Sequence, residues 1–321
     1  MADDEMITDR IGHVPHVQVY DVLAFHLLNA FNDRIHQAGG GVALRSLHPV
    51  YLGSVQRYKV TKLASGLNSA LFHPSTSIIG RQFIELGSAE STNKTAAEML
   101  SAGELVHGAV ILAHEQTAGT GQRGRSWYSA AGLDLTFSVV IFPRHLKADE
   151  QFILGKVTAL ALLDVVSAGV KQEVRIKWPN DVLVERRKIA GVLIQNDLLG
   201  ENVASSIIGI GLNVNNTHFD EDLLATSMAL ETGANVDRWV ILEQLCERLE
   251  ARILQWEKGD DLSGAYASAL WARGRWTEMM IDGATMMARP MDVDGAGRLI
   301  LEMEDGRVEA LGLDRLRFAG R

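Results

Sequence analysis

The chain has 321 residues, 47% of them hydrophobic, which is enough for two or three domains with packed cores. Its formal net charge of −9 disfavours nucleic-acid binding along the whole chain but leaves room for a local basic patch. The one cysteine, Cys246, excludes an intramolecular disulfide and a multi-cysteine metal site, and its leucine neighbours indicate a buried helix position. The acidic start MADDEM lacks the positive region of a signal peptide, and no apolar run approaches the ~18 to 20 residues of a membrane span. We therefore expect a cytoplasmic protein without a membrane partner.

Residues 1–80 differ from the rest in composition. No carboxylate lies between Asp33 and Glu85, and six of the ten histidines fall here at irregular spacings that predict no metal site. A helix is predicted over about 19–36, ended by the glycines at 39–41. Two closely spaced amphipathic helices with a basic second helix are missing from the pattern. A poorly ordered or non-native extension, a DNA-binding module and some other small module stay open as interpretations.

From residue 83 the pattern becomes regular. Ser91 and Thr92 are good N-cap residues for a helix that reaches residue 100 and is closed by Gly103. Strands are predicted over 109–113 and over 133–142, where Leu135, Phe137 and further apolar residues alternate with others.

The stretch between these strands, EQTAGTGQRGRSW at 115–127, is rich in glycine and arginine. Gly119, Gly121 and Gly124 match the spacing GxGxxG, but the dinucleotide fingerprint needs a helix at its third glycine, and here a β-patterned run follows. Glycine permits a positive φ or the close approach of a ligand, and the guanidinium groups of Arg123 and Arg125 favour an anion. We interpret the stretch as a mobile loop that folds over a small anionic ligand; an exposed hairpin loop is the alternative.

The next elements place polar residues at strand ends. A long helix is predicted over 149–169, then a strand over 174–178 that Pro179 terminates. Strands over 182–184 and 189–194 form a hairpin around the basic turn 185–188. Such a turn is usually solvated, but Gly191 leaves room for a ligand beside Lys188.

The remaining third is predicted to contain one strand, two helices and a small β-barrel. In the strand over 206–215, Gly209 and Gly211 share one face with Asn213, so something flat is expected to lie on that face. Helices follow over 237–258 and 262–271. Short strands broken by glycines over 276–318 favour the barrel.

Five motifs, in this order, resemble those of the biotin protein ligases: ESTN at 90–93, the glycine/arginine-rich loop, KWPND at 177–181, RRKIAG at 186–191 and GIGLNVN at 209–215. Their joint occurrence is far more specific than any one of them. The resemblance implies an α+β fold in which a mixed, mainly antiparallel sheet is flanked by helices, as in class II synthetases, with a small C-terminal SH3-like β-barrel. The implied domains are 81–270 for catalysis and 271–321 for the barrel, with 1–80 unassigned.

The resemblance also implies the reaction. Such a ligase uses ATP to activate biotin as biotinyl-5'-AMP, with Mg²⁺ as the expected metal, and then transfers biotin to a lysine of a biotin carboxyl carrier protein. A homodimer is compatible with it, and nucleic acid is not expected as a partner. Two other interpretations stay open: a biotin-responsive repressor that also ligates, and a lipoate-type ligase of the same fold.

The resemblance assigns roles to residues that match the motifs. Catalytic roles fall on Lys188, Arg123 and Asp181, with Lys188 bridging the biotin carboxylate and the phosphate. The expected biotin contacts are Ser91, Thr92, Asn93, Gln116, Gly119, Thr120, Gly121, Gln122, Lys188 and Gly191. The expected ATP contacts are Arg123, Arg125, Trp127, Lys177, Asn180 and Asn213. No residue is assigned to a metal.

One departure from the family pattern concerns the loop. The family often has GRGRRG there, and Thr120 and Gln122 stand in the places of its first two arginines. Two interpretations stay open: Arg123 takes over one of the missing contacts, or the loop holds the intermediate less tightly.

Overall fold

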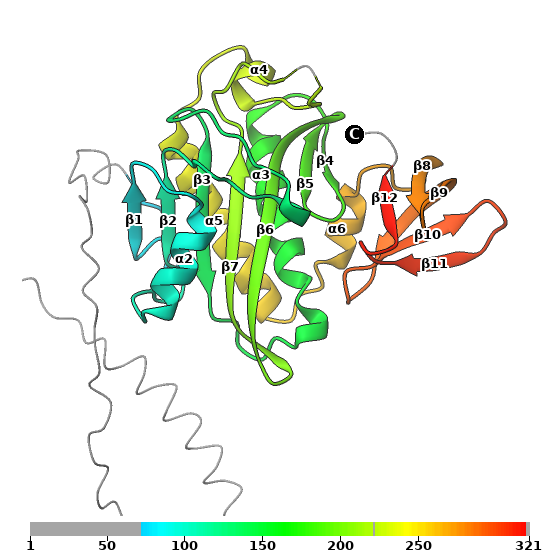
Figure 1. Ribbon diagram of the computed structural model, residues 1–321, viewed down its shortest axis with the longest axis horizontal. Helices are drawn as coiled ribbons and strands as arrows, with labels where there is room; N and C mark the ends of the chain where they lie inside the picture. Colours follow the sequence, from blue (N-terminus) through cyan, green and yellow to red (C-terminus); the bar gives the residue numbers. More distant parts are fainter. Residues whose placement is uncertain (1–71, 221, 319–321) are drawn as a thin grey trace, which may run out of the picture. The chain divides into compact units, whose positions relative to one another are not determined.

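A computed structural model describes residues 72–220 and 222–318 (Figure 1). The chain divides into two compact units, Met1–Lys59 and Val60–Arg321, and the described residues belong to the second. The helix predicted over 19–36 and the interpretations of residues 1–71 lie outside the described residues.

The larger sheet has seven strands and is mixed, as predicted. It runs in the order β1 (Phe83–Leu86), β2 (Val110–Ala113), β3 (Leu135–Ile141), β7 (Asn202–Leu212), β6 (Arg187–Leu199), β5 (Asp181–Val184) and β4 (Val174–Lys177). Only β1 and β2 pair in parallel; the other neighbours are antiparallel. The predicted mixed, mainly antiparallel sheet is confirmed.

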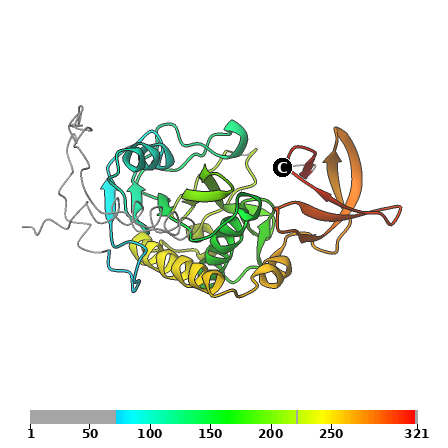
Figure 2. The ribbon, with the colours of Figure 1, turned by 90° about the horizontal axis from the view of Figure 1, so that it is seen from below.

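Helices cover both faces of this sheet (Figure 2). Helices α3 (Ile153–Gly169) and α5 (Arg238–Glu257) lie on one face, and α2 (Thr92–Ser101) lies on the other. Alternation along β3 explains the division: Phe137 and Val139 join the core beneath α3 and α5, whereas the hydroxyl oxygen of Ser138 lies 2.8 Å from that of Thr92 on α2. The polar face of the sheet is therefore the face beneath α2.

Helix α3 begins later than predicted. A single 3₁₀ turn, η3 (Ala148–Glu150), precedes it. Together they form a 22-residue helical stretch, Ala148–Gly169, which with a mean hydropathy of 1.7 is long and apolar enough to cross a membrane by length and composition only. Lys156 and Asp164 interrupt it, so it is not an unbroken apolar run of that length. Within the described residues this stretch packs on the sheet and on α5, and 56% of its most apolar window is buried, the pattern of a core helix.

The basic turn and the strand after it also differ from the prediction. The turn contains only Glu185 and Arg186, so Lys188 is the second residue of β6. Strand β7 starts at Asn202, four residues early, because β6 and β7 pair along almost their whole length out to Leu199 and Asn202. Lys188 is thus held in a sheet rather than in a solvated turn.

The C-terminal region forms a second, five-stranded antiparallel sheet. Its order is β11 (Val308–Leu311), β10 (Leu299–Met303), β9 (Ala284–Val293), β8 (Thr277–Ile281) and β12 (Leu316–Phe318). Strands β11 and β12 are its edges within the described residues, so closure into a barrel is not confirmed. Helix α6 (Ser263–Ala269) precedes it, and Trp178 Nε1 donates to Gly297 O at 2.9 Å, which joins the sheet to the end of β4.

Residues 72–80 pack on the larger sheet. Phe72 is buried and stacks on Phe83, with ring centroids 4.2 Å apart. The Glu250 carboxylate on α5 accepts the backbone N–H groups of Ser77, Ile78 and Ile79 at 2.6 to 2.8 Å. A domain start at residue 81 cuts through these contacts, and we propose instead that the catalytic domain begins before Phe72.

Candidate active site

Two paired glycines, Gly211 on β7 and Gly191 on β6, leave a bare row of backbone on the polar face of the larger sheet. Thr136 on β3 pairs with Gly211 on β7, Gly211 with Gly191 on β6, and Gly191 with Asp181 on β5. A Cβ on Gly211 would lie 2.3 Å from Cε2 of Trp127, so the indole rests directly on the backbone. The flat group expected on Gly209 and Gly211 is the ring of Trp127 at Gly211, whereas the amide of Asn93 lies over Gly209.

Beside this row, side chains at the start of α2 contact strands β3 and β6 and the loop after β2. Ser138 Oγ donates to Asn93 Oδ1 at 2.7 Å, and Asn93 Nδ2 donates to Leu193 O at 3.1 Å. The N–H of Thr92 donates to Gln116 Oε1 at 2.8 Å. Ser91 occupies the N-cap position as predicted, but its side chain makes no capping hydrogen bond. Ser91, Thr92 and Asn93 are all buried, so these groups are fixed in place.

The glycine/arginine-rich loop forms a narrow hairpin. The N–H of Trp127 donates to Gly119 O at 2.9 Å, and that of Gly121 donates to Arg125 O at 2.6 Å. A Cβ on Gly119 would lie 2.5 Å from the carbonyl oxygen of Trp127, so only glycine fits. The tip is one 3₁₀ turn, η2 (Gln122–Gly124), in which Arg123 has a φ of 58°. No long helix opens at Gly124, which agrees with the rejection of the dinucleotide fingerprint.

Lys188 lies at the centre of the arrangement. Its Nζ is 2.6 Å from Asp181 Oδ1 and 5.3 Å from the centroid of the Trp127 ring. A Cβ on Gly191 would come within 3.1 Å of both Lys188 Nζ and Trp127 Cζ3. The missing side chain of Gly191 therefore makes room between a cation and an aromatic wall, as the sequence predicted for this glycine.

Lys177 supplies a second cation in an apolar setting. Its Nζ is 5.5 Å from the ring centroid of Trp271 and 5.4 Å from that of Phe318, on the C-terminal sheet. Burial lowers the pKa of Lys177, and the positive charges of Lys188 and Arg125 lower it further, whereas Asp181 opposes the change. An anion bound here would be stabilised by several cations at once.

These groups line a single cavity of about 920 Å³. It brings together every predicted site residue except Gly119, whose backbone oxygen holds Trp127. The cavity walls place the following together: Ser91, Thr92, Asn93, Gln116, Thr120, Gly121, Gln122, Arg123, Arg125, Trp127, Lys177, Asn180, Asp181, Lys188, Gly191 and Asn213.

The side-chain amides of Asn180 and Asn213 also donate hydrogen bonds to the protein backbone. Asn180 Nδ2 donates to Val192 O at 2.8 Å, and Asn213 Nδ2 donates to Thr226 O at 2.9 Å. The Asn213 side chain is buried, and one of the two hydrogens of its amide is already used in the bond to Thr226 O.

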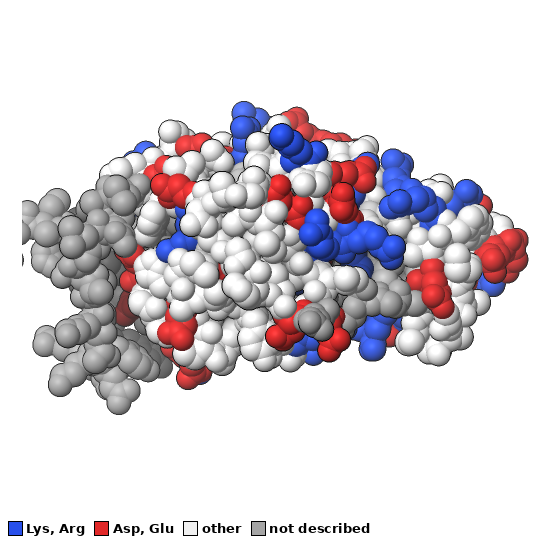
Figure 3. Space-filling model, turned by 90° about the horizontal axis from the view of Figure 1, so that it is seen from above, with Lys and Arg blue, Asp and Glu red and all other residues white. Residues whose placement is uncertain are grey.

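Some wall residues have no marker in the sequence. The segment after β7 adds His218, Phe219, Leu223 and Leu224, and the C-terminal sheet adds Arg317. They reach the cavity only through tertiary folding, and no glycine or spacing marks them. Figure 3 shows Lys and Arg side chains gathered in patches among acidic ones, which agrees with local basic areas on a negatively charged chain.

Comparison with known proteins gives the family. The model of the biotin/lipoate A/B protein ligase family matches residues 86–213. The biotin–[acetyl-CoA-carboxylase] ligase of Mycobacterium tuberculosis is 33% identical over 231 residues, which cover 70% of this chain and 84% of that protein. The chain belongs to the biotin protein ligase family. The matched range contains the first four motifs and most of the fifth, and hence most of the predicted residues of the cavity walls.

Two further proteins are similar to this biotin protein ligase over most of its length. The bifunctional ligase/repressor BirA of Bacillus spizizenii is 29% identical over 242 residues, which cover 73% of this chain and 74% of that protein. The biotin protein ligase of Aquifex aeolicus, solved in complex with biotin and ATP, has the same fold: the TM-score is 0.61 at 23% identity, and the match covers 75% of this chain and all of that one.

Proposed function

We propose that the cavity binds biotin and ATP, forms biotinyl-5'-AMP and passes the biotinyl group to a lysine of a biotin carboxyl carrier protein. The observation that carries this proposal is the position of Lys188, which lies between Asp181 and the Trp127 ring beside the bare backbone of Gly191. A charge in that place can contact a carboxylate and a phosphate together.

In the first step a biotin carboxylate oxygen attacks the α-phosphorus of ATP, and the bond from this phosphorus to the bridging oxygen breaks to release pyrophosphate. Both reactants are anions, so the protein must neutralise and align them. Lys188 would bridge the two reacting groups, while Arg123, Arg125 and Lys177 would hold phosphate oxygens. Asp181 keeps Lys188 in position through the 2.6 Å ion pair.

We place biotin beside the Trp127 ring, which itself covers Gly191 and Gly211, with Asn93, Thr92 and Gln116 at the polar end of the ligand. The polar atoms of these three residues are linked to one another or to the sheet. Trp127 then borders biotin rather than adenosine, because its ring lies against Gly191 and Gly211. Its buried Nε1 has no hydrogen-bond partner among the described residues and can donate to a ligand.

In the second step the amine of the carrier lysine attacks the acyl carbon, and the bond to AMP breaks as the amide forms. The attacking nitrogen loses a proton, and Asp181 is the carboxylate beside the reacting centre that can accept it. Mg²⁺ would arrive with ATP, held mainly by phosphate oxygens and supported by Asp181, whose side chain is 25% exposed.

The remaining parts of the proposal are less central. We assign the C-terminal sheet to the SH3-like domain of the family, with residues 271–321 as its bounds, and expect a cytoplasmic enzyme that can form homodimers. The likeness to a bifunctional ligase/repressor keeps a repressor role as the second candidate.

A cysteine-dependent acyl transfer is not supported. Cys246 is fully buried on α5 and does not line the cavity. Burial raises the pKa of its thiol, which opposes formation of a thiolate nucleophile.

The test is incorporation of radiolabelled biotin into a biotin carboxyl carrier domain with ATP and Mg²⁺. We expect biotin transfer through a biotinyl-5'-AMP that can be isolated when the carrier is left out. Transfer of lipoate without transfer of biotin would contradict the proposal. Retention of operator DNA with a steep salt dependence would add the repressor role.

A further inference from the structure

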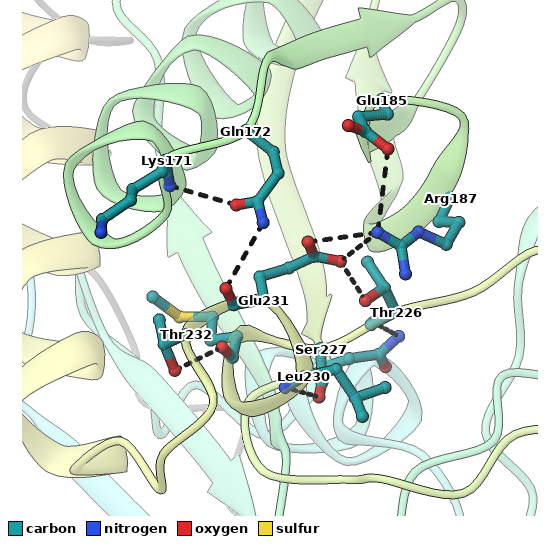
Figure 4. A network of polar contacts seen from close by, with 11 residues as sticks. Lys171, Gln172, Glu185, Arg187, Thr226, Ser227, Leu230, Glu231 and Thr232 are labelled. Carbon is teal, nitrogen blue, oxygen red and sulfur yellow. Dashed lines mark hydrogen bonds and ion pairs between the residues drawn. The ribbon is translucent and has the colours of Figure 1, made fainter.

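An ion pair between Arg187 and a buried glutamate lies outside the cavity, and only Arg187 belongs to one of the five motifs. Glu231 on the short helix α4 (Met228–Thr232) has only 2% of its side chain exposed. Its carboxylate contacts Arg187 Nη2, at 3.0 Å through Oε1 and 3.2 Å through Oε2, and it accepts the hydroxyl hydrogen of Thr226 (Figure 4). Arg187 is the first residue of β6, directly before Lys188.

Thr226 connects this pair to the cavity. Its N–H donates to Lys188 O at 2.9 Å, and its carbonyl oxygen accepts from Asn213 Nδ2 at 2.9 Å. The N–H of Lys188 donates to Leu224 O at 2.7 Å, so residues 224–226 run beside the start of β6 like a short added strand. Thr226, whose hydroxyl group donates to Glu231, is thus hydrogen-bonded to both Lys188 and Asn213. Lys188 is proposed to contact the reacting groups, and Asn213 is proposed to contact adenosine.

We propose that Glu231 and Arg187 are positioning residues, which act through Thr226 to fix Lys188 relative to Asn213. The inference rests on the proposed function and extends it to residues outside the cavity. The adenylation step needs the biotin carboxylate and the α-phosphorus aligned, so a small displacement of Lys188 relative to the nucleotide site has a large effect on rate.

Other contacts hold α4 in place without the carboxylate. Met228 is buried, and a Cβ on Gly169 would lie 2.6 Å from its Cε, so α4 packs tightly on the end of α3. Gln172 Nε2 donates to the backbone oxygen of Glu231 at 3.5 Å, and Ser227 caps the helix by accepting from the N–H of Leu230 (Figure 4). Loss of the Glu231 charge therefore frees residues 224–226 more than it unfolds α4.

Glu231→Gln is the main test variant, because it keeps the shape and turns one acceptor oxygen into a donor that faces Arg187. Thr226→Val removes the hydroxyl and keeps the ion pair, and Thr226→Ser restores the hydroxyl. Glu302→Gln is the matched control: Glu302 also accepts from an arginine, Arg289, at 3.0 Å, but on the C-terminal sheet away from the cavity.

Three quantities are measured: kcat and KM for ATP in biotin-dependent pyrophosphate release, the Kd for biotin by calorimetry, and amide hydrogen exchange at Lys188 and Thr226. We expect Glu231→Gln and Thr226→Val to lower kcat/KM for ATP by about 10- to 100-fold, with little change in the Kd for biotin. Both variants should speed exchange at the two amides. Thr226→Ser and Glu302→Gln should behave like the wild type.

The inference is overturned if the folded Glu231→Gln and Thr226→Val proteins keep the wild-type kcat/KM for ATP, or if exchange at both amides stays unchanged. Should Glu231→Gln not fold, the comparison of Thr226→Val with Thr226→Ser decides alone. A wild-type protein that releases no pyrophosphate would refute the proposed function instead, and hydrogen exchange would still decide whether Glu231 holds Lys188 and Thr226 in place.

Discussion

Single residues at the site differ in how far the sequence could assign them. Lys188 and Gly191 were assigned from the RRKIAG motif, and the structure brings both to the cavity beside Asp181. Arg187 belongs to the same motif, but Glu231, with which it forms an ion pair, lies 44 residues further along the chain. A pairing over that distance depends on tertiary folding, which no local pattern records.

Lys188→Ala is expected to reduce biotinyl-5'-AMP formation by at least about 100-fold, since the loss of one preorganised charge costs on the order of 3 kcal/mol. Lys258→Ala is the control, because this exposed lysine ends α5 and does not line the cavity. Single-turnover formation of the adenylate measures the effect. Equal, small losses in both variants would show that Lys188 has no part in the chemistry.

The lowered pKa of Lys177 gives a pH dependence. A lysine is charged below its pKa and neutral above it, so Lys177 loses its charge at a lower pH than an exposed lysine would. We expect ATP affinity to fall as the pH rises toward that pKa. Lys177→Arg should move the fall to higher pH, since arginine stays charged. The Kd for ATP across the alkaline range is the measurement, and identical profiles would rule out this role.

At the scale of elements, strands and helices with strong periodicity were found with small errors in their ends. Strand β6 is the instructive exception. It continues to Leu199, and Leu198 and Leu199 are 54% and 76% exposed, so burial leaves no alternating pattern there. Backbone pairing with β7 maintains the strand instead. Helix α4 was missed because five residues give no helical period.

The glycine/arginine-rich loop is the element with the departure from its family. Gln122 starts the 3₁₀ turn and lines the cavity, so an arginine there could reach the phosphate of the intermediate. Gln122→Arg should slow release of biotinyl-5'-AMP about tenfold or more, since a hydrogen bond to a charged group contributes roughly 1.5 to 3 kcal/mol. Stopped-flow measurement of release tests this. Equal release rates would mean that Arg123 already supplies the contact.

At the scale of the whole molecule, the sequence predicted a mixed sheet for catalysis and a small C-terminal β-barrel, and it placed the start of the catalytic domain at residue 81, whereas we propose a start before Phe72. The reason is visible in Glu250. A glutamate on a helix usually indicates a solvated face, yet this one is 8% exposed and accepts three backbone N–H groups. The sequence around Phe72 shows no hydrophobic periodicity from which this contact could be predicted.

Truncation tests the revised boundary. A chain that begins at Arg81 loses the stacked Phe72 ring and the hydrogen bonds to Glu250, and we expect its free energy of unfolding to fall by at least about 3 kcal/mol. A chain that begins at Val60 keeps these contacts and should unfold like the full chain. Denaturant unfolding of both compares them directly. Equal stability of the two shortened chains would restore residue 81 as the start.

The contact between Glu250 and residues 77–79 also affects the order in which the chain folds during its synthesis. Ile79 precedes Glu250 by 171 residues. A ribosome adds about 5 to 20 residues per second, so Glu250 is synthesised roughly 10 to 30 s after Ile79. During that interval Phe72 and Ile79 have no helix α5 to cover them. The segment that comes first in the described chain is therefore among the last to reach its place.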